Sequence, residues 1–171
     1  TVRLGHLLAP IGVRYIAFVR RAMPEAGPRG RRDPALATGL AAQLDLAVSR
    51  AEGNAIVYEN EAWIPLRAVA PEGSEVPLDS ADPLAAAQAS SLAGATPVAE
   101  GDTAGPGTLL WGESADAGWS ATLDGAATNR RDAYGWTNAF ELDDRGEIDV
   151  SFSWRAYPIL AWAQLVLWAL A

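Results

Sequence analysis

Residues 119–125, with the sequence WSATLDG, constrain the fold of this chain more than any other stretch. Trp119, Ala121 and Leu123 alternate with polar neighbours, and this period of two places one face of a strand on a core and the other in water. The strand ends at Asp124-Gly125, which is a strong hairpin signal because glycine reaches positive φ at no steric cost. The segment therefore predicts a half-buried strand and a tight turn.

A second alternating segment follows the polar turn at residues 143–147. Ile148, Val150, Phe152 and Trp154 are separated by polar residues, as in another half-buried strand. This end of the chain is therefore predicted to be an antiparallel β unit.

The first 70 residues predict a mixture of helices and strands. Leu4 to Ile11 has the pattern of a short amphipathic helix, which Pro10 and Gly12 interrupt. The remaining elements are expected to be a buried central strand at 13–19, a helix at 34–43, a hairpin of strands at 46–50 and 55–59, and an irregular strand at 63–66 that contains Pro65.

Composition narrows the classes of protein further. The chain has 171 residues, half of them apolar, so it is long enough for one domain with a substantial core. Its net charge is −8, and all 13 basic residues are arginine. An acidic chain of this kind is not expected to bind nucleic acid, which needs clustered positive charge. The lack of cysteine excludes disulfides, thiol nucleophiles and thiolate metal sites.

Two segments differ in composition from the rest. Residues 71–107 have no basic side chain and are rich in alanine, glycine, proline and serine, which predicts an acidic linker. Residues 157–171 carry no charge and are apolar around a whole helix, with Trp154, Tyr157 and Trp162 near their start. Aromatic residues gather at membrane interfaces in this way, so the sequence favours the start of a transmembrane helix over a buried soluble helix.

The order of these motifs resembles a known group of membrane proteins. The segment around WSATLDG, the aromatic-glycine-aromatic run YGW at 134–136, the alternating strand and the final apolar run follow one another. IGVRYI at 11–16, VYEN at 57–60 and IPLR at 64–67 precede them. Together they resemble the C-terminal extracytoplasmic region of YfhO-like multi-pass bacterial membrane proteins and related membrane glycosyltransferases, with residues 70–105 unmatched.

The resemblance implies an extracytoplasmic domain on the outer side of the cell membrane. Such a domain would cover the membrane-embedded site or hold a glycan or polyprenyl-linked sugar during assembly of cell-envelope glycans. The alternative is a purely structural or protein-interaction module of the envelope. The resemblance places catalytic acidic residues elsewhere in the full protein, so no catalytic residue and no cofactor is expected in this segment.

The candidate sugar contacts are Tyr134, Trp136 and Asn138. Aromatic rings pack against the apolar faces of sugars, and an amide both donates and accepts hydrogen bonds. The alternative is that Tyr134 and Trp136 lie in the core with Trp119.

Other polar groups are assigned structural roles. Glu59 and Glu61 beside Trp63 suggest a carboxylate-plus-aromatic sugar site, although outward-facing glutamates and a core tryptophan are the favoured explanation. The single histidine, His6, is interpreted as a surface or capping residue. No metal is expected at the acidic residues of 71–107, which lack the spacing of a calcium loop. The acidic residues of 143–149 are interpreted as a β-turn and not as a metal site. Arg20 to Arg32 holds five arginines and is interpreted as a solvated loop, with anionic lipid head groups as the alternative partner.

The predicted fold is α+β, an antiparallel β-sandwich-like sheet with a few peripheral helices and a C-terminal apolar helix. Its predicted organisation is an N-terminal α/β portion at 1–70, a linker at 71–107, an antiparallel β unit at 108–156 that completes one domain, and the start of a membrane helix at 157–171.

Overall fold

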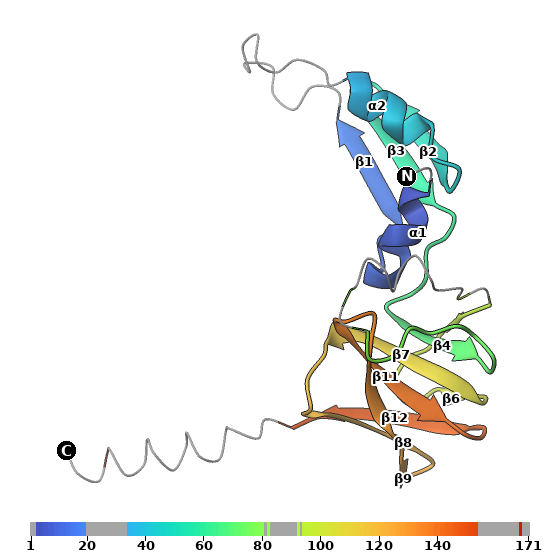
Figure 1. Cartoon of the computed structure of the whole chain (residues 1–171), viewed down its shortest axis with the longest axis vertical. Helices are drawn as coiled ribbons and strands as arrows, with labels where there is room; N and C mark the ends of the chain where they lie inside the picture. The colour runs from blue at the N-terminus through green and yellow to red at the C-terminus, as the bar shows by residue number, and fades with distance from the viewer. Residues whose placement is uncertain are drawn as a thin grey trace.

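The structure is a computed structural model that describes residues 3–19, 34–80, 82, 92, 94–153 and 168 (Figure 1). Among the described residues 48% lie in strands and 13% in helices, so the fold is mainly antiparallel β-sheet and the predicted α+β class is confirmed. The first three strands form an N-terminal unit, and the later strands form a second unit of two sheets. We call the second part the two-sheet unit (residues 67–153).

The N-terminal unit is a three-stranded antiparallel sheet with short helices. In chain order it contains α1 (Leu4–Leu8), the 3-10 helix η1 (Ala9–Ile11), β1 (Tyr15–Val19), α2 (Pro34–Ala41), β2 (Leu46–Glu52) and β3 (Ala55–Asn60). The strand order is β1-β3-β2. Gly53, at φ +52, supports the turn of the predicted β2–β3 hairpin, which is confirmed.

The expectation that residues 13–19 form a buried central strand is wrong. β1 lies at the edge of its sheet, because β3 returns between β1 and β2 and pairs with both. Tyr15 and Val19 are consequently about half exposed, at 51% and 50%. The sequence of β1 is rich in β-formers, but that richness does not distinguish an edge strand from a central one.

The two-sheet unit is built from nine strands, in a five-stranded and a four-stranded sheet. The five-stranded sheet has the order β10 (Arg130–Ala133), β11 (Thr137–Leu142), β7 (Gly107–Ser114), β4 (Arg67–Pro71) and β5 (Thr96–Pro97). The four-stranded sheet has the order β6 (Thr103–Ala104), β12 (Gly146–Phe152), β8 (Trp119–Leu123) and β9 (Ala126–Ala127).

One apolar cluster joins the two sheets. Leu109 of β7, Phe140 of β11 and Ile148 of β12 are fully buried, and they pack with Val69 and Val150 in the same cluster. Because residues from both sheets contribute inward-facing side chains, the two sheets share one core. Figure 1 shows the four-stranded sheet, with β8, β9 and β12, on the side away from the N-terminal unit.

A second apolar cluster lies on the opposite face of the five-stranded sheet. Leu110 and Ala139, which alternate with the inward-facing residues of β7 and β11, pack with Tyr134, Ala9 and Ile64. Ala9 belongs to η1 and Ile64 to the segment that follows β3. This second cluster therefore joins the N-terminal unit to the two-sheet unit, and we call it the junction cluster.

The predicted strand-turn at residues 119–125 is confirmed. β8 ends at Leu123, and Asp124 and Gly125 both have positive φ, at 50° and 79°, before β9 pairs back on β8. β12 also shows the predicted alternation, with Ile148 and Val150 buried between exposed polar residues.

The expected linker at 71–107 contributes strands to both sheets. Its described residues form β5 beside β4 and β6 beside β12, each only two residues long. Short edge strands suit a sequence rich in glycine and proline, since such residues limit pairing. Residues 63–66 form no strand, and β4 begins at Arg67.

Among the described ranges, no helix is both long and apolar enough to cross a membrane. The expected membrane helix at 157–171 lies outside the described residues except for Trp168. The arginine-rich loop at 20–32 also lies outside them.

Candidate functional site: a pocket between the two units

Hydrogen bonds to residues far away in the sequence fix the position of α1. The Leu4 N–H donates to Gln43 Oε1 at 2.7 Å, and the His6 N–H donates to Asp45 Oδ2 at 2.6 Å. Between them Gly5 is buried, and a Cβ there would overlap the Asn60 side chain and lie 2.9 Å from the Asp45 carbonyl oxygen. α1 therefore docks closely on the ends of β2 and β3 only because residue 5 has no side chain.

Asn60 closes this contact from the other side. It is 2% exposed, and its amide nitrogen donates to the carbonyl oxygens of Gly5 at 2.8 Å and Val13 at 2.9 Å. Its Oδ1 accepts the Ala62 N–H at 3.0 Å. One buried amide thus connects α1, the start of β1 and the segment after β3.

A pocket of about 440 Å³ opens where α1 and η1 meet the segments at 61–64 and 92–95. We call it the junction pocket. Arg3, His6, Glu61 and Trp63 supply its polar and aromatic lining. The apolar lining, from Ala9, Pro10, Ala62, Ile64, Leu92 and Ala95, is largely shared with the junction cluster.

The Trp63 side chain is held in place by two contacts. Its indole Nε1 donates to the Gly12 carbonyl at 3.1 Å, and the Arg14 guanidinium carbon lies 4.8 Å from the ring centre. Arg14 in turn pairs with Glu59 at 3.1 Å. Glu59 is therefore engaged in an ion pair, whereas Glu61 is exposed at the pocket.

These groups suit a small polar ligand with an apolar face. Binding sites for small molecules commonly have volumes of 300–1,000 Å³ and often lie between structural units. A carboxylate accepts hydrogen bonds, a guanidinium donates them, and an imidazole does both. Sugar hydroxyls donate and accept, and a pyranose presents apolar C–H faces to an aromatic ring.

The structure places the three predicted contacts at the β10–β11 turn. Asn138 is fully buried, and its Oδ1 accepts the Arg130 Nε–H at 2.9 Å and the Asp116 N–H at 3.3 Å. Its amide nitrogen donates to the carbonyls of Glu113 at 3.0 Å and Ser114 at 3.3 Å. The amide of Asn138 is thus occupied in joining β11 to the last residues of β7 and, through Asp116, to the loop that follows.

Tyr134 and Trp136 lie in the same turn. Tyr134 and Gly135 both have positive φ, at 54° and 71°, and Tyr134 is only 1% exposed. Trp136 is half-buried and packs against the junction cluster. Trp119 belongs instead to the core between the sheets, so the aromatic residues separate onto the two faces of the five-stranded sheet.

In the sequence Glu61 and Trp63 suggest a sugar site, but outward-facing glutamates are the favoured interpretation, and nothing there places Arg3 or His6 beside them. The pocket forms because α1 bonds to residues 39 positions away, through Gln43 and Asp45. No local pattern predicts contacts at such separations. The detectable signal was the combination of Glu61 and Trp63.

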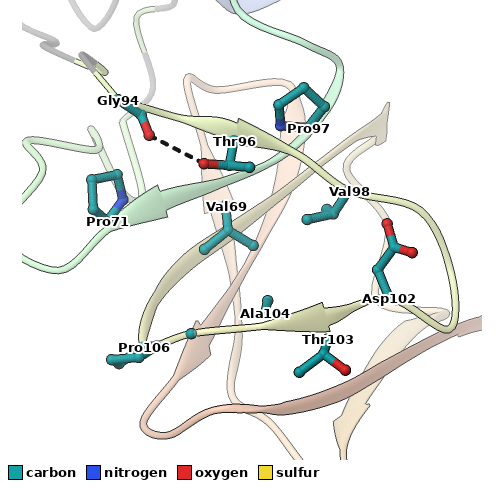
Figure 2. A pocket seen from close by; sticks show the side chains of 11 residues that line it. Val69, Pro71, Gly94, Thr96, Pro97, Val98, Asp102, Thr103, Ala104 and Pro106 are labelled. Atoms are coloured by element: carbon teal, nitrogen blue, oxygen red, sulfur yellow. Dashed lines mark hydrogen bonds between the residues drawn. The ribbon is translucent and has the colours of Figure 1, made fainter.

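A second pocket, of about 370 Å³, lies where β5 and β6 end the two sheets (Figure 2). Figure 2 shows Val69, Val98 and Ala104 around it, with Thr96 bonded to the Gly94 carbonyl. Its acidic residue, Asp102, accepts the Ala99 N–H at 2.7 Å. Because its lining offers few polar side chains, the junction pocket is the better candidate for a polar ligand.

The acidic groups weighed as metal ligands have structural partners in several cases. Arg131 donates from Nε to Asp79 Oδ2 at 2.9 Å, and this hydrogen bond lowers the pKa of Asp79 below its ordinary value of 3.8. Asp144 Oδ1 accepts the Arg145 N–H at 2.7 Å. Within the described part of the chain, no group of three His, Cys, Asp or Glu residues could hold a metal ion.

Comparison of the chain with family models, with curated proteins and with solved structures gives no match.

Proposed function

We propose that this chain is the extracytoplasmic domain of a multi-pass membrane protein similar to membrane glycosyltransferases, and that its junction pocket holds a glycan or a lipid-linked sugar. In this proposal the domain binds and positions the sugar, and the reaction takes place elsewhere in the parent protein. The observation that carries the binding role is the lining of the junction pocket, which combines Trp63, Glu61, Arg3 and His6 with apolar side chains.

The proposal moves the sugar contacts away from the three residues that the sequence suggested. The burial of Tyr134 and Asn138 leaves Trp136 as the partly accessible member of that set. Binding there would require the β10–β11 turn to open, whereas the junction pocket is already formed.

The alternative function is a structural or protein-interaction module of the cell envelope. The observation in its favour is that the side-chain amide of Asn138 makes its hydrogen bonds within the fold. The same holds for the buried amide of Asn60. Under this alternative the pocket would bind no sugar.

Titration of the 171-residue chain with envelope oligosaccharides distinguishes the two functions. The chain is kept in a detergent without a sugar head group, and amide chemical shifts are followed at millimolar saccharide. We expect shifts at residues 3–10 and 61–64 that saturate, and weaker binding in Glu61→Gln and Trp63→Ala.

The matched control is Glu147→Gln, which removes the same type of charge from an exposed residue of β12, outside the pocket lining. Its affinity should equal that of the unaltered chain. No saturable shift at millimolar saccharide, or equal losses in Glu147→Gln and Glu61→Gln, would favour the structural module instead.

A further inference from the structure

An aromatic group lies at one end of the two-sheet unit, where β8 begins and β12 ends. Trp119 and Phe152 are paired across β8 and β12, and their ring centres are 4.9 Å apart. Trp111 of β7 lies 6.5 Å from Trp119, so the group extends from one sheet to the other. We call Trp111, Trp119 and Phe152 the aromatic end.

This aromatic end is only partly covered. Trp111 is 2% exposed, but Trp119 is half-buried and Phe152 is 39% exposed. An exposed phenylalanine beside a half-buried tryptophan is apolar surface that remains in contact with water. A single residue of this kind is ordinary, but here the exposed ring continues a buried aromatic group.

Among the described residues near the aromatic end, the cation Arg67 has a carboxylate partner. The Arg67 guanidinium carbon lies 4.2 Å from the centre of the Trp111 ring, and Arg67 pairs with Glu113 at 3.0 Å. Asp116 accepts the Gly118 N–H at 2.6 Å. In the described part of this end, Arg67 is paired with Glu113 and Asp116 adds a negative charge, which suits an uncharged or zwitterionic surface more than an anionic one.

Close contacts fix the position of β12 at this end. The Ser153 N–H donates to the Gly118 carbonyl at 2.9 Å. A Cβ at Gly118 would lie 2.6 Å from the Ser153 carbonyl oxygen and 2.8 Å from Phe152 Cε2, so glycine is required for this approach. The chain therefore leaves the two-sheet unit at a defined point beside Phe152.

The residues that follow Ser153 in the sequence indicate what covers the aromatic end. Residues 156–171 carry no charged side chain. An extended chain advances about 3.3–3.6 Å per residue, so the three residues after Ser153 can span at most about 11 Å. The polar layer on each side of a bilayer is about 5–8 Å thick. If residues 157–171 enter a membrane, Phe152 and Trp119 lie at or close to its polar layer, where aromatic side chains are favoured.

We propose that the aromatic end contacts the polar layer of a phospholipid bilayer and thereby sets the orientation of the domain on the membrane. This inference rests on the part of the proposed function that attaches the chain to a membrane. It does not depend on sugar binding. It also predicts which end of the two-sheet unit faces the lipid, with the β8–β9 turn at Asp124-Gly125 facing away.

Two labelled chains test this orientation. Because the sequence lacks cysteine, Ala117→Cys and Ala126→Cys each provide one attachment site for a nitroxide label. Both alanines are exposed; Ala117 lies next to Gly118 at the aromatic end, and Ala126 follows the turn at the other end of β8. The full chain is reconstituted in phosphatidylcholine vesicles, and collision of the label with oxygen and with a water-soluble nickel complex is measured.

We expect the ratio of oxygen to nickel accessibility to be severalfold higher at position 117 than at position 126. Phe152→Asp should lower the ratio at position 117, whereas Ser151→Asp, on the neighbouring exposed residue, should not. Flotation with the vesicles is measured on the same samples. A chain that floats with both labels equally exposed to water overturns this inference alone, while a chain that does not float overturns the membrane attachment as well.

Discussion

The two units of this chain bury their apolar residues to very different extents. In the two-sheet unit Leu109, Phe140 and Ile148 are completely buried between two sheets. In the N-terminal unit Tyr15 and Val19 are about half exposed, and Val48 is 60% exposed. The three-stranded sheet depends more on polar contacts, through Asn60, Gln43 and Asp45. The junction pocket takes most of its lining from residues before the two-sheet unit, where fewer apolar side chains are buried.

The largest predicted effect is on the core between the sheets. Phe140→Ala should lower the free energy of unfolding by about 3–5 kcal/mol, because it removes a large side chain from a site that is 0% exposed. Val19→Ala, at a half-exposed edge position, should change it by less than about 0.5 kcal/mol. Urea unfolding of both variants measures the difference, and equal losses would contradict the comparison of the two units.

The next effect concerns the polar contacts of the N-terminal unit. Asn60→Ala leaves the Gly5 and Val13 carbonyls without their donor, and each buried unsatisfied group costs about 1–3 kcal/mol. Because the loss is local, amide exchange should speed up in residues 4–13 more than in β7 and β11. An equal rise in amide exchange rates across both units would show that Asn60 stabilises the whole fold and not the docking of α1 in particular.

Much of the sheet pattern could be predicted from the sequence, because alternation and turn chemistry are local. Trp119 to Gly125 and Ile148 to Val150 show their strand and turn assignments directly. The edge position of β1 could not be predicted, since it depends on which strand returns beside it. The junction pocket depends on contacts 39 residues apart, from Leu4 to Gln43 and from His6 to Asp45.

Local sequence patterns also could not predict that Tyr134 and Asn138 are buried. Asn138 and Phe140 lie on the same face of β11, but only the pairing of β11 with β7 reveals that the Asn138 amide nitrogen bonds to the last two residues of β7. Tyr134 is buried because η1 and the segment after β3 cover the other face of the sheet. Both outcomes follow from tertiary packing.

A smaller effect is expected at the turn of the two-sheet unit. Gly125→Val should destabilise the fold by about 1–2 kcal/mol, because a β-branched residue is strained at φ +79°. No atom lies within 4 Å of a Cβ at Gly125, so the cost comes from the backbone alone. Gly105→Val is the matched control, since Gly105 also has open space and its φ lies outside the positive range. Equal midpoints of thermal unfolding for the two variants would contradict a cost from positive φ at residue 125.

The smallest effect concerns the ion pair at the edge of β10. Arg131 lowers the pKa of Asp79, so the pair stabilises the fold at pH values above the ordinary Asp value of 3.8 and is lost as the pH falls through the lowered pKa. In Arg131→Gln the pKa of Asp79 should rise toward 3.8. Carboxyl ¹³C shifts measure this pKa directly, and an unchanged value would show that Arg131 is not its cause.

We propose that a sugar binds in the junction pocket and not at the β10–β11 turn. Isotope-filtered nuclear Overhauser measurements between a saccharide and the labelled 171-residue chain test it most directly. We predict cross-peaks from sugar ring protons to the side chains of Trp63 and His6, and none to Tyr134. Cross-peaks confined to Tyr134 and Trp136, or no cross-peaks at millimolar saccharide, would contradict the claim.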